Sequence, residues 1–274
     1  MALEITYVEI REALESSGEC FLCTLERDLE QKYTDHYLYE LVMEPASRAE
    51  IVASRGFCNY HFYEMLSEAG RPKTADGLGM ALIMESVNKA LIEEIKGQLE
   101  ATKDVGESES SSLATKFGLG KRDVHSRLLR TKGKRPSLLS KQIHRMLSLK
   151  NPCPACEHID TFVNMFIDVF INALNERSQR IAELFADSKG LCVPHYMTVM
   201  CRLDEKLPDL KKGPVARQIV EVQLKNMRRL NTEFSEYVRK HDYRFSKEPW
   251  GSEQDVVPRG VAKLSGKQGV RRAL

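Results

Sequence analysis

The chain has 274 residues, a length that suits one large domain or two of roughly 100–150 residues. Hydrophobic residues make up 42% and charged residues 29%, a composition that excludes collagen-like, wholly disordered and membrane-spanning chains. From Met1 to Gly18 no basic segment precedes an apolar stretch, so we expect no signal peptide and a cytoplasmic location. In that compartment the seven cysteines are expected to be thiols or metal ligands.

The formal net charge of +2 conceals a strong segregation along the chain. Residues 1–103 carry 10 basic and 19 acidic side chains, a balance of −9. Residues 116–150 carry 11 basic and one acidic side chain, a balance of +10, and residues 259–274 add five basic ones. Such blocks are typical of solvated linkers or of segments that bind an anionic partner.

The first region, residues 1–103, has the apolar periodicity of helices. Apolar side chains recur every four residues from Leu25 to Leu41, and a second series runs from Leu78 to Ile95. Pro45 predicts the end of the first long helix, and residues 46–54 are expected to form a shorter return helix. Few stretches alternate with a period of two, so strands are not expected to dominate.

Residues 104–136 interrupt this pattern with a Ser/Glu-rich run followed by a Lys/Arg-rich one. Neither run can bury enough apolar surface to offset the entropy of ordering its backbone, which predicts a flexible linker. A purely solvated linker is one interpretation. The other is a site for an anionic partner, such as a nucleic-acid backbone or an acidic protein surface, with seven candidate residues: Lys121, Arg122, Arg127, Arg130, Lys132, Lys134 and Arg135.

Helical periodicity returns over residues 137–246. We expect a short basic helix over 137–149, an apolar helix around Phe162–Leu174, and one long helix over 215–243 with Pro214 near its first turn. The long helices 78–95 and 215–243 are expected to pack the two halves together. Residues 247–274 form a basic tail that is expected to be loosely ordered by itself.

A polar and aromatic cluster follows the last long helix. One interpretation is that its rings cap the helical bundle while its charges pair with helix ends. The other is a recognition surface for a protein or a nucleotide. The candidates are Asp242, Tyr243, Arg244, Phe245 and Trp250.

The cysteines reveal an internal duplication. Cys20-x2-Cys23 is followed by Cys58-x2-His61, and Cys153-x2-Cys156 is followed at nearly the same distance by Cys192-x2-His195. The two sets are offset by 133–134 residues, and they use six of the seven cysteines. Two quartets of the same type and order are not expected by chance.

Each motif places two metal ligands on one side of a turn or helix. The residues between the two motifs could form a helical hairpin, with about 15 residues in its first helix and 12 in its second. Such a hairpin would bring the second motif back beside the first and complete a tetrahedral site. Gly56 and Gly190 are candidates for the tight turn before each second pair. We therefore predict one site within each half: Cys20, Cys23, Cys58 and His61, and then Cys153, Cys156, Cys192 and His195.

Zn²⁺ is the metal that this donor set favours, and four protein ligands per site indicate a structural rather than a catalytic role. Three alternatives remain: an iron–sulfur cluster, disulfide-forming redox pairs, and buried cysteines without a metal. The fold prediction is an all-α duplicated helical-hairpin bundle with two structural metal sites. Its parts are a zinc-binding repeat at 1–103, the linker at 104–136, a second repeat at 137–246 and the tail.

The paired motif resembles an uncharacterised prokaryotic family of unknown function whose members carry two Cys-x2-Cys … Gly-x-Cys-x2-His units in a mostly helical chain. The stretch Asp242-Tyr-Arg-Phe245 looks like the family's C-terminal signature. The resemblance implies metal sites and helices but no established activity. It also implies Ser-Trp and a regular helix after Asp255, where this sequence has Val256-Val257-Pro258.

These patterns predict a non-catalytic, zinc-stabilised binding or adaptor protein with a protein partner. The first alternative is a nucleic-acid- or ribosome-associated factor that uses the basic linker and tail. The second is a thiol-redox or metal-handling enzyme.

Overall fold

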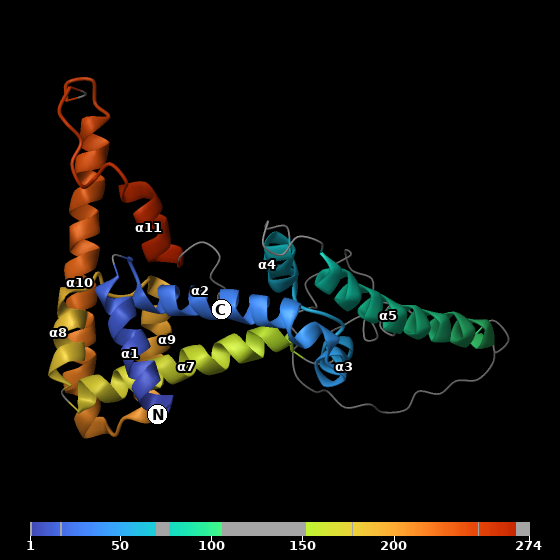
Figure 1. Ribbon diagram of the computed structural model, residues 1–274. Coiled ribbons are helices and arrows are strands. Elements are labelled where there is room, and N and C mark those ends of the chain that lie inside the picture. Colours follow the sequence, from blue (N-terminus) through green and yellow to red (C-terminus); the bar gives the residue numbers. More distant parts are fainter. Residues whose placement is uncertain are drawn as a thin grey trace.

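The predicted all-α class is confirmed. The computed structural model describes residues 2–16, 18–69, 77–105, 152–176, 178–245 and 247–266. Within these ranges the chain forms ten α-helices and one 3-10 helix, and it contains no strand (Figure 1). None of the helices described is both long and apolar enough to cross a membrane.

The first half contains five α-helices and the 3-10 helix η1. Pro45 occupies the first turn of α3, as its fixed backbone angle favours, so the short helix expected at 46–54 begins and ends one residue earlier. The elements are α1 (Ala2–Glu15), α2 (Phe21–Tyr39), η1 (Leu41–Met43), α3 (Pro45–Ala53), α4 (Asn59–Ala69) and α5 (Leu78–Val105).

The second half repeats the order of α2, α3, α4 and α5 as α7, α8, α9 and α10, so the duplication extends to the structure of the described residues. Adding 133 to the first residue of α2 gives the first residue of α7, and adding 134 to both ends of α3 gives both ends of α8. The elements are α7 (Pro154–Asn175), α8 (Gln179–Asp187), α9 (Val193–Lys206), α10 (Asp209–Lys240) and α11 (Val256–Ser265). Among the described helices, α11 has no counterpart in the first half.

Helices α2 and α7 pack side by side and run in opposite directions, so the start of each lies near the end of the other (Figure 1). The larger hydrophobic core lies at the start of α2, where α1, α8, α9 and α10 join the pair. Phe170 lies at its centre, with ring centroids 5.1 Å from Phe21 and 4.9 Å from Phe185. Packing between the two halves therefore fixes the position of α2 relative to α7.

A second, smaller core lies at the other end of α2. It joins η1, α3, α4 and the first turns of α5 to the start of α7. Tyr37 and Phe57 meet edge to face with centroids 5.2 Å apart, and Cys153 and Ala155 of the second half are buried against this cluster. Both cores consequently contain residues from both halves of the chain.

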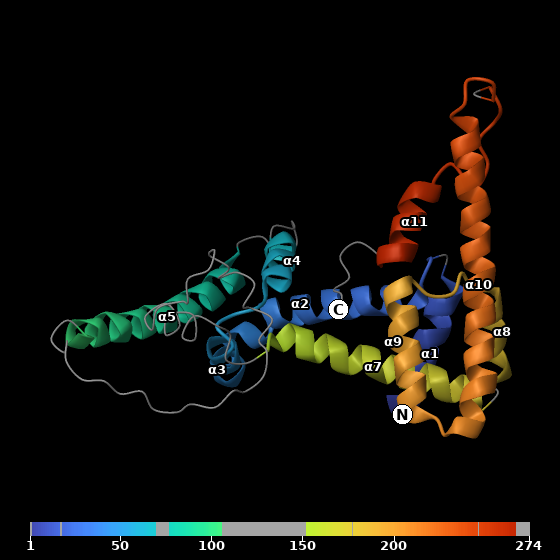
Figure 2. The same ribbon diagram turned by 180° about the vertical axis from the view of Figure 1, so that it is seen from behind.

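Two sequence-based expectations about the long helices are wrong. Helices α5 and α10 lie at opposite ends of the molecule and do not pack the halves together (Figures 1 and 2). The halves meet through α1, α2 and α7 instead, because α2 and α7 carry the apolar faces that both cores bury. Helix α10 also starts six residues earlier than expected, at Asp209, and it includes Pro214.

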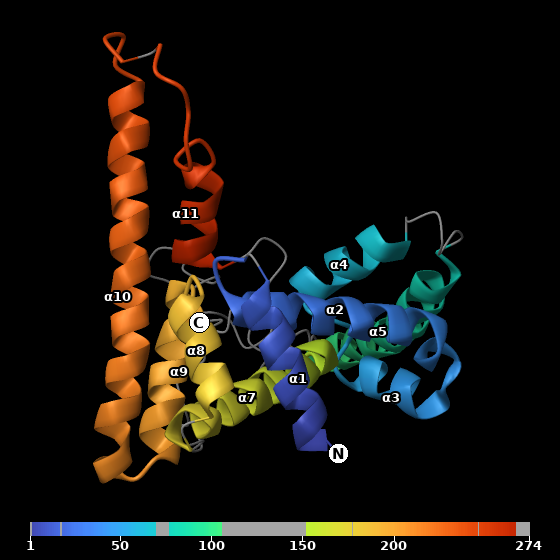
Figure 3. The same ribbon diagram turned by 60° about the vertical axis from the view of Figure 1, so that its left-hand side comes forward.

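The tail is not wholly irregular, which corrects a further expectation. Residues 256–265 form α11, which packs on α9 and α10 (Figure 3). Gly260 permits this contact, because a Cβ there would lie 2.1 Å from the Phe234 ring. Lys263, on the same buried face, is fully enclosed. The basic charge of the tail therefore did not prevent part of it from packing.

The corner between α10 and α11 projects from the far tip of α10 rather than capping the bundle (Figure 3). Within it the Lys240 ammonium donates to the Pro249 carbonyl at 2.7 Å and to the Glu253 carboxylate. The Trp250 ring lies tilted against the Tyr237 ring, with centroids 5.4 Å apart. The polar and aromatic residues of this corner thus pack at the C-terminal end of α10.

Acid should open this corner. The hydrogen bonds from Lys240 and from the Gly251 backbone N–H lower the pKa of Glu253 to about 2, from its usual 4.5. A carboxyl with a lowered pKa stabilises the folded form above the unfolded-state value, and this contribution is lost as pH falls from about 4.5 toward 2. Trp250 is the single tryptophan of the chain, so its fluorescence should report the transition. Glu253→Gln should abolish that change, whereas Asp209→Asn, at the opposite end of α10, should retain it.

Candidate metal centres

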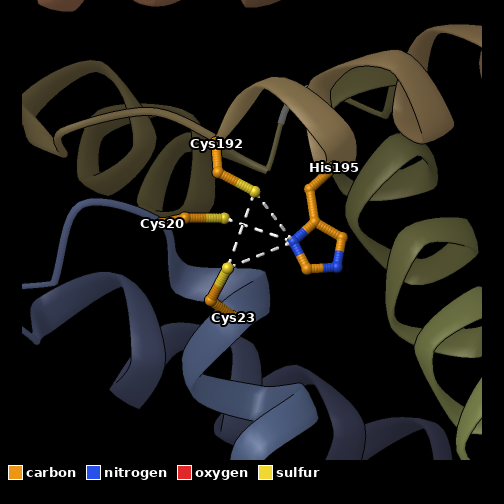
Figure 4. Close-up of side chains that lie close together, drawn as sticks. All are labelled: Cys20, Cys23, Cys192 and His195. Atoms are coloured by element: carbon orange, nitrogen blue, oxygen red, sulfur yellow. Dashed lines mark hydrogen bonds between the residues drawn. The ribbon is translucent and has the colours of Figure 1, made fainter. Parts of the chain in front are cut away.

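The first cluster, called centre A, joins the start of α2 to the start of α9. Cys20 and Cys192 are the residues directly before these helices, and Cys23 and His195 lie in their first turns (Figure 4). The Nδ1 atom of His195 lies 3.5, 3.4 and 3.3 Å from the sulfurs of Cys20, Cys23 and Cys192. All four residues are buried.

The second cluster, called centre B, joins the start of α4 to the start of α7. The Nδ1 atom of His61 lies 3.2 Å from the Cys58 sulfur and 3.5 Å from the sulfurs of both Cys153 and Cys156. The sulfurs of Cys58 and Cys156 are 3.7 Å apart. His61 and Cys153 are buried, whereas Cys58 and Cys156 are half-buried.

The eight ligand candidates are therefore the predicted ones, but the predicted pairing is wrong. Each cluster combines the Cys-x2-Cys pair of one half with the Cys-x2-His pair of the other. The reason is helix length. The 19 residues of α2 carry the chain about 28 Å from Cys20, and the 9 residues of α3 could return it by only about 13 Å. Cys58 therefore stays at the far end, where α7 begins.

A family model matches residues 1–270 of the chain, and its description is a family of unknown function (DUF6062). The chain belongs to DUF6062. No curated protein and no solved structure matches it. The resemblance seen in the sequence thus holds for almost the whole length of this DUF6062 protein.

Tight turns aim the two Cys-x2-His pairs, as the sequence predicted for their glycines. Gly56 and Gly190 have φ angles of +95° and +75°, in the left-handed region that glycine adopts without strain. A Cβ at Gly190 would lie 3.1 Å from the Gln223 side-chain oxygen, which accepts a hydrogen bond from the Leu191 backbone N–H. The positive φ angle and the close Gln223 oxygen therefore both favour glycine at position 190.

Gly190→Ala should lower the free energy of unfolding of the DUF6062 chain by about 1–3 kcal/mol, because alanine is strained at this φ and crowds Gln223. Gly97→Ala is the matched control. A Cβ at that position in α5 would meet no atom within 4 Å, so the change should stabilise by about 0.5–1 kcal/mol. Denaturant titration followed by circular dichroism measures both. Equal effects of the two substitutions would contradict the role assigned to Gly190.

Two buried carboxylates that sequence reasoning missed lie beside the histidines. Glu26 and Glu30 stand one turn apart on α2, and each approaches a different centre. The Glu26 carboxylate lies 3.1 Å from Nε2 of His195, on the opposite side of the ring from the sulfurs. The Glu30 carboxylate lies 3.9 Å from Nε2 of His61 and accepts the Tyr60 hydroxyl at 2.7 Å. Helix α2 thus supplies an acidic neighbour to both centres.

The sequence did hold a signal for these carboxylates. Glu26 and Glu30 follow Cys23 at intervals of three and seven residues, which places them on the helix face of that ligand. The corresponding positions of α7, 133 residues later, hold Ile159 and Val163, which are buried in the larger core. The duplication is therefore asymmetric at this point.

Basic side chains surround centre A. The Lys263 ammonium, from α11, donates to the backbone carbonyls of Glu19, at 3.2 Å, and of Lys189. These carbonyls lie in the two loops that lead to Cys20 and Cys192. Desolvation lowers the pKa of Lys263, and the nearby Cys20 and Glu19 oppose this shift. Arg229 also donates to the Glu19 carboxylate at 2.7 Å. The last two helices thus hold the loops of centre A.

The neighbouring sulfurs favour the protonated form of the imidazole in both clusters. Burial alone would lower the pKa of His61, but the sulfurs of Cys153 and Cys58 raise it to about 9. The corresponding groups raise the pKa of His195 well above its usual value against the same desolvation. A cation that binds to these donors takes the place of their protons.

The other candidate residues that the structure describes belong to neither centre. The seven basic linker residues, together with the predicted helix over 137–149, fall outside the residues that the structure describes. In the corner, Asp242 pairs with Arg244 at 2.7 Å, and the guanidinium of Arg239 lies over the Phe245 ring. Tyr243 is 85% exposed and Trp250 is 42% exposed. Cys201, outside both clusters, is exposed on α9.

Proposed function

We propose that this DUF6062 protein binds one structural Zn²⁺ at each centre and acts as a non-catalytic adaptor for a protein partner. The single observation that carries the metal assignment is the convergence of six sulfurs and two imidazoles into two compact quartets. In each quartet all four donor atoms lie within 4.8 Å of one another.

The donor spacing favours a single tetrahedral ion. With Zn–S distances of about 2.3 Å and a Zn–N distance of about 2.0–2.1 Å, a tetrahedron separates its donor atoms by roughly 3.5–3.8 Å. The shorter donor separations in the two centres, from 3.2 to 3.7 Å, fall near this range, and no two donor atoms of a centre are more than 4.8 Å apart. An iron–sulfur cluster distributes its four protein ligands over two or four irons and so spreads the set further apart. Thiolate and imidazole donors together favour Zn²⁺ among divalent ions.

A structural role follows from the number of ligands. Three sulfurs and one nitrogen fill all four positions of a tetrahedral ion, so neither water nor substrate has a place on it. Each ion would instead fasten the starts of two helices that belong to different halves. The centres would then set the geometry of the α2–α7 pair and of everything that packs on it.

Elemental analysis of the purified protein should find about two zinc ions per chain. Replacement by Co²⁺ should give the intense visible absorption of a tetrahedral ion with thiolate ligands, because that spectrum reports geometry and sulfur ligation together. A metal content near zero, or iron with labile sulfide, would overturn the assignment.

Exposed apolar side chains support a protein partner. On α11, Val257, Val261 and Leu264 follow one another at intervals of four and three residues, so they share one face. They are 47–58% exposed, and the opposite face of α11 is buried against α9 and α10. Exposed apolar stripes of this kind are typical of interaction surfaces.

Substituting Val261 and Leu264 by serine should weaken binding of the partner without changing metal content, since both side chains point away from the centres. The matched control is Ile5→Ser on α1, an equally exposed apolar residue elsewhere (61%). Binding to RNA or DNA that falls steeply with salt, and that these substitutions leave unchanged, would instead favour the nucleic-acid hypothesis.

A further inference from the structure

We propose that the two centres differ in kind: centre A keeps its ion, whereas centre B exchanges Zn²⁺ with a thiol or chelating acceptor and thereby controls the docking of α3, α4 and α5. This inference rests on the proposed zinc-binding function and assigns a regulatory role to one of its two sites. Three differences between the centres carry it: access to the sulfurs, support of the histidine, and compensation of charge.

Access differs first. An acceptor that removes a fully coordinated ion must approach a metal-bound sulfur, because no coordination position is vacant. The three sulfurs of centre A belong to buried residues. At centre B, Cys58 and Cys156 are half-buried, and their sulfurs lie 3.7 Å apart. We therefore expect an incoming ligand to reach the sulfurs of centre B more readily than those of centre A.

Support of the histidine differs next. A carboxylate beside the outer nitrogen of a metal-bound imidazole orients the ring and strengthens it as a ligand. The Glu26 carboxylate oxygen lies 3.1 Å from Nε2 of His195, at ion-pair distance, although the two atoms are not aligned as a hydrogen bond. The buried Nε2 of His61 has no hydrogen-bond partner, and the Glu30 carboxylate, engaged by the Tyr60 hydroxyl, stays 3.9 Å away. His61 is thus the less firmly held ligand.

The third difference is charge. Three thiolates, one neutral imidazole and Zn²⁺ carry a net charge of −1, which is costly to bury without a nearby cation. Centre A has the fully buried Lys263 between its two ligand loops. In the turn before Cys58, the basic residue that corresponds to Lys189 is Arg55, and its buried guanidinium pairs with Glu94 of α5 at 2.6 Å. Within the described residues, the cation in the ligand turn of centre B is thus paired with a carboxylate, whereas the Lys263 ammonium at centre A is held by two backbone carbonyls.

Exchange at centre B would act on a defined part of the fold. Its ion joins Cys58 and His61, at the start of α4, to Cys153 and Cys156, at the start of α7. The same junction contains the smaller core, in which Cys153 is packed beside residues of η1, α3 and α4. Loss of the ion removes four bonds from that junction and none from the larger core.

The exchange step involves no oxidation or reduction. A thiolate or chelating ligand of the acceptor forms a bond to Zn²⁺, the bond from Cys58 or Cys156 to the ion breaks, and the released sulfur takes up a proton from water. Repetition of this step transfers Zn²⁺ to the acceptor and leaves centre B protonated.

The test uses the two-zinc protein mixed with excess 4-(2-pyridylazo)resorcinol, which absorbs visible light when it takes up Zn²⁺. Release should occur in two phases of one equivalent each, with rates at least about tenfold apart, as the loss of outer support at a metal site implies. Cys58→Ser should remove the fast phase and leave the slow one. Cys201→Ser, outside both centres, should retain both phases.

A second measurement needs no variant. A pulse of N-ethylmaleimide after the fast phase should label Cys58, Cys153 and Cys156 but not the cysteines of centre A. At the same moment amide hydrogen exchange should increase in α3 and α4 and stay slow in α9 and α10. Release of both ions in one phase, a fast phase that labels centre A, or unchanged protection of α3 and α4 would overturn the inference. Absence of bound zinc at the start would instead overturn the proposed function.

Discussion

A chain that carries both Cys20→Ser and Cys192→Ser should retain about one zinc ion, whereas a chain with Cys20→Ser and Cys58→Ser should retain none. Cys20 and Cys192 belong to the same centre, so the first pair of changes damages one site only. Cys20 and Cys58 belong to different centres, and the second pair damages both. Each site with a lost thiolate is expected to bind zinc too weakly to survive purification.

Elemental analysis of the two double variants, normalised to protein concentration, decides the pairing. Pairing within each half would give the opposite result, with one ion retained in the second variant and none in the first. Cys201→Ser is the control for the loss of a cysteine as such, because it lies in neither cluster and should leave two ions per chain.

Removing both ions should abolish the cooperative thermal unfolding of the protein. Structural zinc in small peptides contributes on the order of 10 kcal/mol per site, as much as the whole folding free energy of a typical domain, about 5–15 kcal/mol. Without the ions, each buried quartet would also need protons in place of a cation. We expect the smaller core to lose its packing first, since fewer apolar residues hold it.

Differential scanning calorimetry with and without a strong chelator measures this effect. Subsequent addition of Zn²⁺ in excess should restore the transition, whereas Mg²⁺, which prefers oxygen ligands, should not. A metal-free protein with an unchanged unfolding transition would show that the clusters are not structural centres.

The identity of the ligands could be predicted from the sequence, but their pairing could not. The spacing of the residues within Cys20-x2-Cys23 and Cys58-x2-His61 shows that each motif can supply two ligands to a metal ion. It does not show whether the chain between them turns back. That depends on where the helices end: α2 runs to Tyr39, and α3 is too short to retrace it. Because both halves share this geometry, crossed pairing satisfies both sites at once.

Helix α11 and the two buried carboxylates also could not be predicted, because both depend on contacts between segments that are distant in the sequence. The basic tail has the composition of an irregular segment, yet Gly260 and Lys263 fit against α10 and the loops of centre A, and that fit stabilises α11. Glu26 and Glu30 look like solvated helix charges until the partner helices bring a histidine to each. The all-α class could be predicted because it depends only on hydrophobic periodicity, which is a property of each helix by itself.

The crossed ligation also bears on how the duplicated chain could have arisen. If two copies of a single half lay antiparallel about a twofold axis, each would give its Cys-x2-Cys pair to one ion and its Cys-x2-His pair to the other. Such a pair would be a homodimer with an isologous interface and two bridging ions, stable before any covalent fusion. Joining the copies end to end then freed the halves to diverge. Glu26 against Ile159 and Glu30 against Val163 are differences that an exact homodimer could not possess.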